Sequence, residues 1–148
     1  MDLIREGIAA AREFGLAFSG PGMLGILARI SPDCAEQDRA PTEGEAVIAA
    51  GCAGHKQLYF CRDAAEVMLR RGDRARARRY ADPLEGFCKD EPLAWSRFYV
   101  ARTLALANRA EGLRDDETSA ALGSLRDEAA RIGLSAALPA IDWALVPS

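Results

Sequence analysis

The chain has 148 residues, a formal net charge of −3 and a hydrophobic fraction of 49%, which is typical of a globular domain rather than a disordered chain. The acidic balance argues against a general nucleic-acid-binding protein, which usually carries a basic surplus. No apolar run approaches the roughly 18 residues that a membrane span needs, and the charged start MDLIREGIAAAREFG is unlike a signal peptide. We therefore expect a cytoplasmic protein with neither a membrane nor a nucleic acid as its partner.

The cysteines are spread along the chain and form no CxxC pair. Disulfide frameworks belong to short secreted chains, and zinc sites want closely spaced pairs. We expect reduced cysteines that serve as small hydrophobic side chains, with no metal or cofactor. The four residues are Cys34, Cys52, Cys61 and Cys88.

Hydrophobic periodicity indicates helix along almost the whole chain, and alanine, leucine, arginine and glutamate dominate the composition. A first helix is expected over residues 3–14, with Gly15 as its C-terminal stop. The second helix should have Pro21 in its first turn, where the fixed φ of proline is tolerated, and should end near Ile30.

A third helix is expected over residues 32–50 with a break or kink near Pro41, because proline removes one backbone hydrogen bond and crowds the carbonyl of Gln37. Thr42 and Glu45 have the spacing of a capping box, so two shorter helices are an alternative.

The fourth helix is expected over residues 56–71, with Gly72 closing it and Asp73 capping the fifth. Pro83 should bend this fifth helix, whose apolar stripe is Ala77, Tyr80, Ala81, Leu84 and Phe87.

Three more helices are expected, from Pro92, over residues 118–132 and from Pro139. Asp115 and Asp116 lie in the preceding turn as capping groups. With about seven or eight helices, short turns and no strand pattern, the sequence predicts one all-α domain over residues 1–148 built from antiparallel helical hairpins.

Two echoes in the sequence indicate a structural repeat. YFCRDAA (59–65) returns 40 residues later as YVARTLA (99–105), and Gly72 returns as Gly112. A second echo aligns Gly15 with Gly133 and Pro21 with Pro139, an offset of 118 residues that is close to three such periods. Repeats of this length are typical of stacked helical hairpins, each of which buries its apolar face against the next.

The turn and helix GDRARARRYAD resemble the tetratricopeptide repeat, with Ala77 at the small-residue position of the motif. Cys61, Ala64, Ala65, Met68 and Ala81 stand where the motif has other residues. The resemblance implies a right-handed superhelix of stacked hairpins.

Longer segments resemble the C-terminal helical-repeat region of large bacterial regulators that combine a cyclase-like domain with an ATPase module. They are EGEAVIAAG, YFCRDAAEVMLRRGDRARARRYADPLE, EPLAWSRFYVARTLAL and LRDEAARIGLSAALPAI. The resemblance implies a non-catalytic, tetratricopeptide-like segment. The chain has no GxxxxGK[ST] phosphate-binding loop.

The repeated tyrosines and arginines are the candidate partner-binding residues. In one copy Tyr59, Arg62, Glu66 and Arg70 share a side of the fourth helix, and in the next copy Tyr99, Arg102, Leu106 and Arg109 form an equivalent exposed row. Such rows could hold an extended or acidic peptide, since arginine binds carboxylates bidentately and tyrosine offers a rigid surface. The alternative is that the tyrosines pack between hairpins and the arginines pair with Asp63 or Glu66.

The stretch Arg70–Arg79 holds six arginines in ten residues, which raises a DNA-associated regulatory module as an alternative function. No aromatic residues interleave for base stacking, and nearby acids offset the charge, so a solvated helix face is favoured.

An all-α enzyme with a pocket around His55, Tyr59 and Cys61 is a second alternative, with Cys52 as the other thiol near the single histidine. Because no catalytic constellation accompanies that histidine, we expect no enzyme.

The leading interpretation is thus a scaffold for protein–protein or inter-domain interaction. The first helix adds one further expectation, because its apolar residues need a partner: either the helix that begins at Pro21 or a second copy in a homodimer. These residues are Leu3, Ile4, Ile8, Ala11 and Phe14, continued by Leu16 and Phe18.

Overall fold

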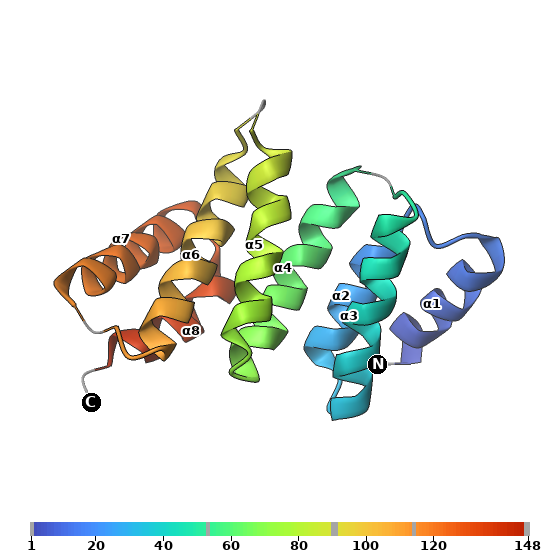
Figure 1. Cartoon of the computed structure of the whole chain (residues 1–148), viewed down its shortest axis with the longest axis horizontal. Coiled ribbons are helices and arrows are strands. Elements are labelled where there is room, and N and C mark those ends of the chain that lie inside the picture. Colours follow the sequence, from blue (N-terminus) through green and yellow to red (C-terminus); the bar gives the residue numbers. More distant parts are fainter. Residues whose placement is uncertain (1, 53, 90–91, 114, 147–148) are drawn as a thin grey trace.

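Figure 1 presents a computed structural model, which describes residues 2–52, 54–89, 92–113 and 115–146. Within these ranges the chain forms α-helices and one short 3-10 turn, without strands, so the all-α prediction and the expected number of helices are confirmed. The elements are α1 (Asp2–Phe14), α2 (Gly20–Ile30), α3 (Cys34–Ala49), α4 (Gly54–Arg70), α5 (Arg74–Phe87), α6 (Ala94–Ala110), α7 (Asp116–Ile132), the turn η1 (Ser135–Ala137) and α8 (Leu138–Leu145).

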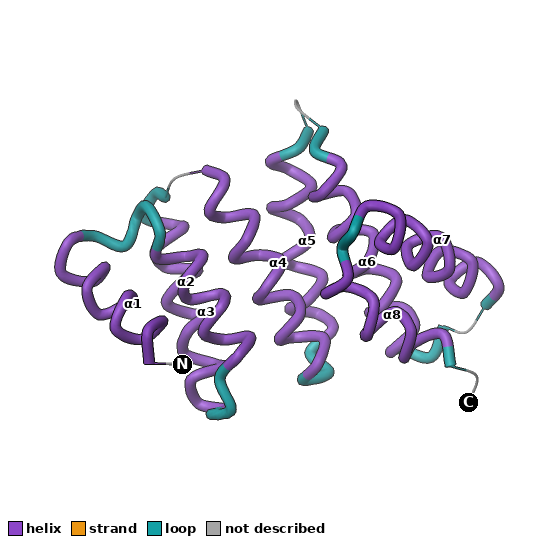
Figure 2. Tube along the Cα trace, turned by 180° about the vertical axis from the view of Figure 1, so that it is seen from behind, coloured by secondary structure: helices purple, strands orange, loops and turns teal. Residues whose placement is uncertain are grey.

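The helices stack along the long axis of the molecule. The even-numbered helices form one row in which α2 packs on α4, α4 on α6 and α6 on α8, while α3, α5 and α7 each pack against the even-numbered helix before them. Helix α1 lies at one end and α7 and α8 at the other, in the front view and in the view from behind (Figures 1 and 2). The buried core runs through the whole stack and includes Ile8, Leu24, Phe60, Met68, Leu84, Phe98, Leu122 and Ile141.

The prolines do not interrupt their helices. Helix α3 continues through Pro41 and α5 continues through Pro83, so a break at Pro41 into two shorter helices is wrong, while the kink at Pro41 and the bend at Pro83 stay predictions. Pro41 is itself buried in the core, and most helical stability in a folded protein comes from such packing rather than from one backbone hydrogen bond. Thr42 caps no new helix, because its hydroxyl donates to the carbonyl of Asp38 at 3.0 Å within α3.

The predicted turn between α4 and α5 is confirmed. Gly72 adopts a left-handed φ of +75°, which ends α4 and is strained for other residues. The side chain of Asp73 then accepts a hydrogen bond from the backbone N–H of Arg76 at 3.0 Å, and Asp115 accepts in the same way from Thr118 at 2.7 Å at the start of α7.

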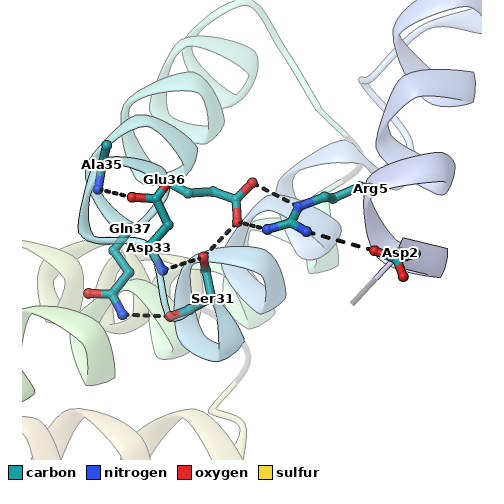
Figure 3. Close-up of polar contacts among 7 residues, drawn as sticks. All are labelled: Asp2, Arg5, Ser31, Asp33, Ala35, Glu36 and Gln37. Atoms are coloured by element: carbon teal, nitrogen blue, oxygen red, sulfur yellow. Dashed lines mark hydrogen bonds and ion pairs between the residues drawn. The ribbon is translucent and has the colours of Figure 1, made fainter.

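Ion pairs attach α1 to α3. The guanidinium of Arg5 donates two hydrogen bonds to Glu36, at 3.1 and 2.8 Å, and Ser31 donates a third at 2.6 Å (Figure 3). Seven residues further along each helix, Arg12 forms the same double contact with Glu43 at 2.9 and 2.6 Å. The equal spacing of the two pairs means that α1 and α3 run in the same direction.

Only part of the apolar stripe of α1 is buried. Ile8 is 2% exposed and packs in the core, and Ile4 is partly buried against it. Leu3 and Phe14, by contrast, are 85% and 88% exposed. Helix α1 therefore packs on α2 with one side only. Leu3 and Phe14, on the rest of its surface, are open to solvent.

Candidate functional site

A charged cavity of about 200 Å³, the arginine pocket, lies where α2, α4, α6 and the turn before α8 meet. Tyr99 and the turn residues 136–137 complete its wall. Its charged lining residues are Arg29, Arg62, Asp63, Glu66, Arg70 and Arg102.

A buried carboxylate is among the residues that line this pocket. Asp63 is 1% exposed and accepts two hydrogen bonds from Arg62, each of 2.9 Å. The Nε atom of Arg29 lies 3.2 Å from the same carboxylate. Two guanidinium groups thus compensate one buried negative charge, which would be costly to bury alone.

The second acid of the pocket connects α4 to α6. Glu66 accepts a 2.7 Å hydrogen bond from Arg102, whose Nε also donates to the carbonyl of Ala137 at 3.2 Å. Arg70 donates to the carbonyl of Arg29 at 2.8 Å. Because four arginines face two acids, 4 − 2 leaves the lining with a formal charge of +2.

Aromatic rings surround one of these arginines. The guanidinium carbon of Arg62 lies 5.6 Å from the ring centres of Tyr59 and Trp95 and 5.8 Å from that of Tyr99. The rings also contact one another, with Trp95 and Tyr99 centred 4.7 Å apart. Cation–π contacts of this kind fix the guanidinium in place at the edge of the pocket.

The structure brings four of the six predicted residues into the arginine pocket. Arg62, Glu66, Tyr99 and Arg102 line it. Tyr59, which is 44% exposed, belongs to the aromatic group around Arg62. Arg109 lies elsewhere, since its Nε donates to the carbonyl of Ala144 in α8 at 2.8 Å.

The prediction that the α6 row is exposed is wrong. Tyr99, Arg102 and Leu106 are 9%, 3% and 8% exposed, because α8 packs on α6 at this end of the stack. The arginines pair with Asp63 and Glu66 as the packing alternative expected. The more accessible arginines of the pocket, Arg29 and Arg70, therefore lie on α2 and α4.

The sequence did not identify two residues of the site. Arg29 has no arginine 40 residues later, where Leu69 stands, and it reaches the pocket through the packing of α2 on α4. Trp95 likewise has His55 at the equivalent earlier position, so the echo carried no sign of an aromatic group.

Acidic residues on neighbouring helices pair with several arginines of the Arg70–Arg79 stretch. Arg71 contacts Asp38 at 3.0 Å, and Arg78 contacts Glu111 at 2.9 Å. The guanidinium of Arg76 lies 3.6 Å from Glu45. These arginines contact acids of other segments of the fold, and their charge is therefore partly neutralised.

The thiol of Cys61, which belongs to the alternative enzyme pocket around His55, is a poor nucleophile. Burial raises the pKa of the Cys61 thiol to about 12, so it stays protonated at neutral pH. His55 is exposed at the start of α4. Among the described residues, no group of three or more histidine, cysteine or acidic side chains is placed to hold a metal ion.

None of the described helices is both long and apolar enough to cross a membrane. Comparisons with protein-family models, curated proteins and solved structures gave no match to this chain. Its function must therefore be argued from the geometry of its own sites.

Proposed function

We propose that the chain is a non-catalytic helical-repeat scaffold whose arginine pocket binds an acidic segment of a protein partner or of another domain in a larger regulator. The observation that carries the proposal is the surplus of +2 in the pocket of a chain whose net charge is −3. A cationic cavity on an acidic protein favours one sign of ligand and repels basic segments.

The arrangement of the donors supports a carboxylate as the bound group. The side chain of Arg29 is 40% exposed, and its buried Nε lacks a hydrogen-bond acceptor despite lying close to Asp63. Arg70 lies exposed beside Arg29, and one of its nitrogens donates a hydrogen bond to a backbone carbonyl. Guanidinium groups keep further N–H donors in such contacts, and a carboxylate accepts them in pairs.

The repeat interpretation supports the same function. The proposed architecture is a right-handed, tetratricopeptide-like superhelix, in which rows of first helices form the binding face. The proposed setting is a signalling ATPase or cyclase, and the module itself would perform no chemistry.

Fluorescence anisotropy with labelled peptides tests this proposal. A glutamate-rich peptide of about ten residues should bind the protein, whereas its lysine counterpart should not, and binding should weaken with salt. Arg70→Glu should lower the affinity at least about tenfold, because it places a carboxylate beside the ligand.

The matched control is Arg131→Glu, which makes the same charge change at an exposed position of α7. Equal losses for the two variants would mean that only net charge matters and would contradict a pocket. Absence of binding by the glutamate-rich peptide would contradict the proposed ligand class.

A further inference from the structure

Two grooves occur at equivalent places, 40 residues apart in the sequence. The first, here the filled groove, lies between α3, α4 and α5, and the second, here the open groove, lies between α5 and α6. Glu45, Ile48, Ala49, Gln57, Phe60 and Cys61 line the first; Glu85, Cys88, Lys89, Arg97, Val100 and Ala101 line the second, each 40 positions later.

An aromatic pair fills the first groove. The rings of Phe60 and Tyr80 pack edge to face with their centres 5.8 Å apart. The hydroxyl of Tyr80 donates a hydrogen bond to Glu45. Burial and this hydrogen bond raise the pKa of the Tyr80 phenol, so it remains a donor at neutral pH.

The second groove lacks both rings. Val100 stands in place of Phe60, and Leu84 in place of Gly44 compensates for part of that lost volume. The buried residues Ala77, Ala81 and Leu84 of α5 correspond to Thr118, Leu122 and Leu125 of α7, each 41 positions later, so Tyr80 corresponds to the exposed residue Ala121.

Without a counterpart of Tyr80, the open groove has unfilled space and a carboxylate that can accept a hydrogen bond. The open groove measures about 680 Å³ against about 330 Å³ for the filled groove. Among the described residues its lining comes from α5, α6 and their connection, so α7 does not close it as α5 closes the filled groove. Glu85, the counterpart of the hydroxyl acceptor Glu45, is retained and exposed.

We propose that the open groove binds a tyrosine side chain presented by a helix of a partner protein, with the Glu85 carboxylate accepting the phenolic hydrogen bond. The filled groove supplies the argument for this occupant, because there a helix, α5, presents a tyrosine to the equivalent carboxylate over equivalent apolar positions. This surface is separate from the arginine pocket, so the inference goes beyond the proposed function.

Tyrosine suits the groove better than a purely apolar side chain. Leu84, Val100 and Leu104 form its apolar floor, which an aromatic ring covers well. A phenylalanine would leave the Glu85 carboxylate without the hydrogen bond that a phenol donates. Charge-assisted hydrogen bonds are stronger than neutral ones, so the hydroxyl should decide specificity.

Methyl NMR titration of the full chain with p-cresol, the side-chain analogue of tyrosine, tests the site directly. p-Cresol should bind with an affinity on the order of millimolar and shift the methyl signals of Leu84, Val100 and Leu104. Toluene, which lacks the hydroxyl, should bind about three- to tenfold more weakly, in keeping with one hydrogen bond to a partly exposed carboxylate. Absence of p-cresol shifts at these methyls would overturn the proposal.

Two variants separate the hydroxyl from the apolar contact. Glu85→Ala should weaken p-cresol about three- to tenfold without changing toluene, whereas Glu117→Ala on α7 should change neither. Ala101→Phe fills the groove from an exposed position and should abolish the binding of both compounds, with Ala75→Phe on α5 as its control. Equal binding of p-cresol and toluene, unaffected by Glu85→Ala, would also overturn the proposal.

A helical peptide then tests the source of the phenol. An alanine-based helix of about 20 residues with one central tyrosine should compete with p-cresol at a lower concentration than p-cresol itself requires. Its phenylalanine counterpart should compete more weakly. Failure of the tyrosine helix to compete, while p-cresol binds, would overturn the partner-helix assignment and leave a site for small phenols.

Discussion

The two ends of the helical stack are attached by different chemistry. At the N-terminal end, Arg5 and Arg12 of α1, whose side chains are 45% and 53% exposed, pair with the carboxylates of Glu36 and Glu43. At the C-terminal end, Arg102 and Arg109 of α6 donate to backbone carbonyls at residues 137 and 144. The polar contacts of α1 to α3 thus depend on titratable, salt-sensitive partners. The polar contacts of α8 combine carbonyl acceptors that do not titrate with one exposed ion pair, Arg126–Asp142.

The difference predicts where the protein opens first. Exposed ion pairs contribute little, because water and salt screen them, whereas removing one partner of a buried pair leaves the other charge uncompensated. We therefore expect α1 to open locally at a lower free energy than α8 under acidic or high-salt conditions. Native-state hydrogen exchange should reveal this as an earlier loss of protection in α1.

The largest effect is expected at the C-terminal attachment. Arg102→Ala removes a 3% exposed guanidinium and leaves Glu66 and the Ala137 carbonyl without their donor. It should lower the free energy of unfolding by about 3 kcal/mol, as measured by urea denaturation at pH 7. A loss below about 0.5 kcal/mol, the range of ordinary surface substitutions, would mean that Arg102 is not a structural residue.

Arg102 also shows what the sequence could not reveal. The 40-residue echo predicted that Arg62 and Arg102 occupy equivalent positions, and both do line the arginine pocket. The two arginines differ in exposure because each depends on how the next helix in the row covers it. The short segment from Leu138 onward did not indicate how closely α8 would cover α6. Packing between distant helices, rather than local pattern, decides which member of a repeated pair is buried.

The helices themselves were largely predictable, because apolar periodicity, glycine stops and aspartate caps are local signals. Gly72, Asp73 and Asp115 act as the sequence indicated. The break expected at Pro41 was wrong because burial of Pro41 in the core stabilises the continuous helix. That is a tertiary effect, which local sequence rules do not contain. Arg29 and Trp95 of the candidate site required the same long-range information.

A smaller, pH-dependent effect is expected at the N-terminal attachment. Hydrogen bonds from Arg5 and Ser31 lower the pKa of Glu36 from 4.5 to about 2 in the folded protein. Because the folded pKa lies below the unfolded one, the stabilisation is fully present above pH 4.5 and is lost as the pH falls toward 2. Glu36→Gln should cost about 1–2 kcal/mol at pH 7.

The pH profile distinguishes this role from simple packing. Urea denaturation of the wild type and Glu36→Gln should give curves whose separation shrinks as the pH drops from 5 toward 2. Arg109→Ala serves as the comparison, since the Nε of Arg109 donates to the Ala144 carbonyl, which does not titrate. A constant separation between wild type and Glu36→Gln at every pH would contradict the ionic attachment of α1.

A still smaller effect is expected for the outer ion pair. The side chains of Arg12 and Glu43 are 53% and 32% exposed, so Arg12→Ala should cost no more than about 0.5 kcal/mol. The cost should fall further in 1 M salt, where the screening length is about 3 Å. Thermal denaturation at low and high salt measures both values, and an effect that does not change with salt would exclude an electrostatic origin.

The last prediction concerns association rather than folding. Phe14 and Phe18 are 88% and 68% exposed at and beyond the end of α1, and Leu3 is 85% exposed in its first turn. Such a group of exposed apolar side chains favours contact with a second copy, and a two-fold dimer is the commonest closed arrangement. We expect light scattering to show a mass that rises with protein concentration toward that of a dimer. Phe14→Ser should abolish the rise and leave the free energy of unfolding of the monomer within about 0.5 kcal/mol, because the ring makes few contacts within its own chain.

The control is Trp143→Ser at the other end, where an 82% exposed ring lies on α8. If Trp143→Ser abolished the rise and Phe14→Ser did not, the self-association would belong to the α8 end, and the assignment to α1 would be wrong.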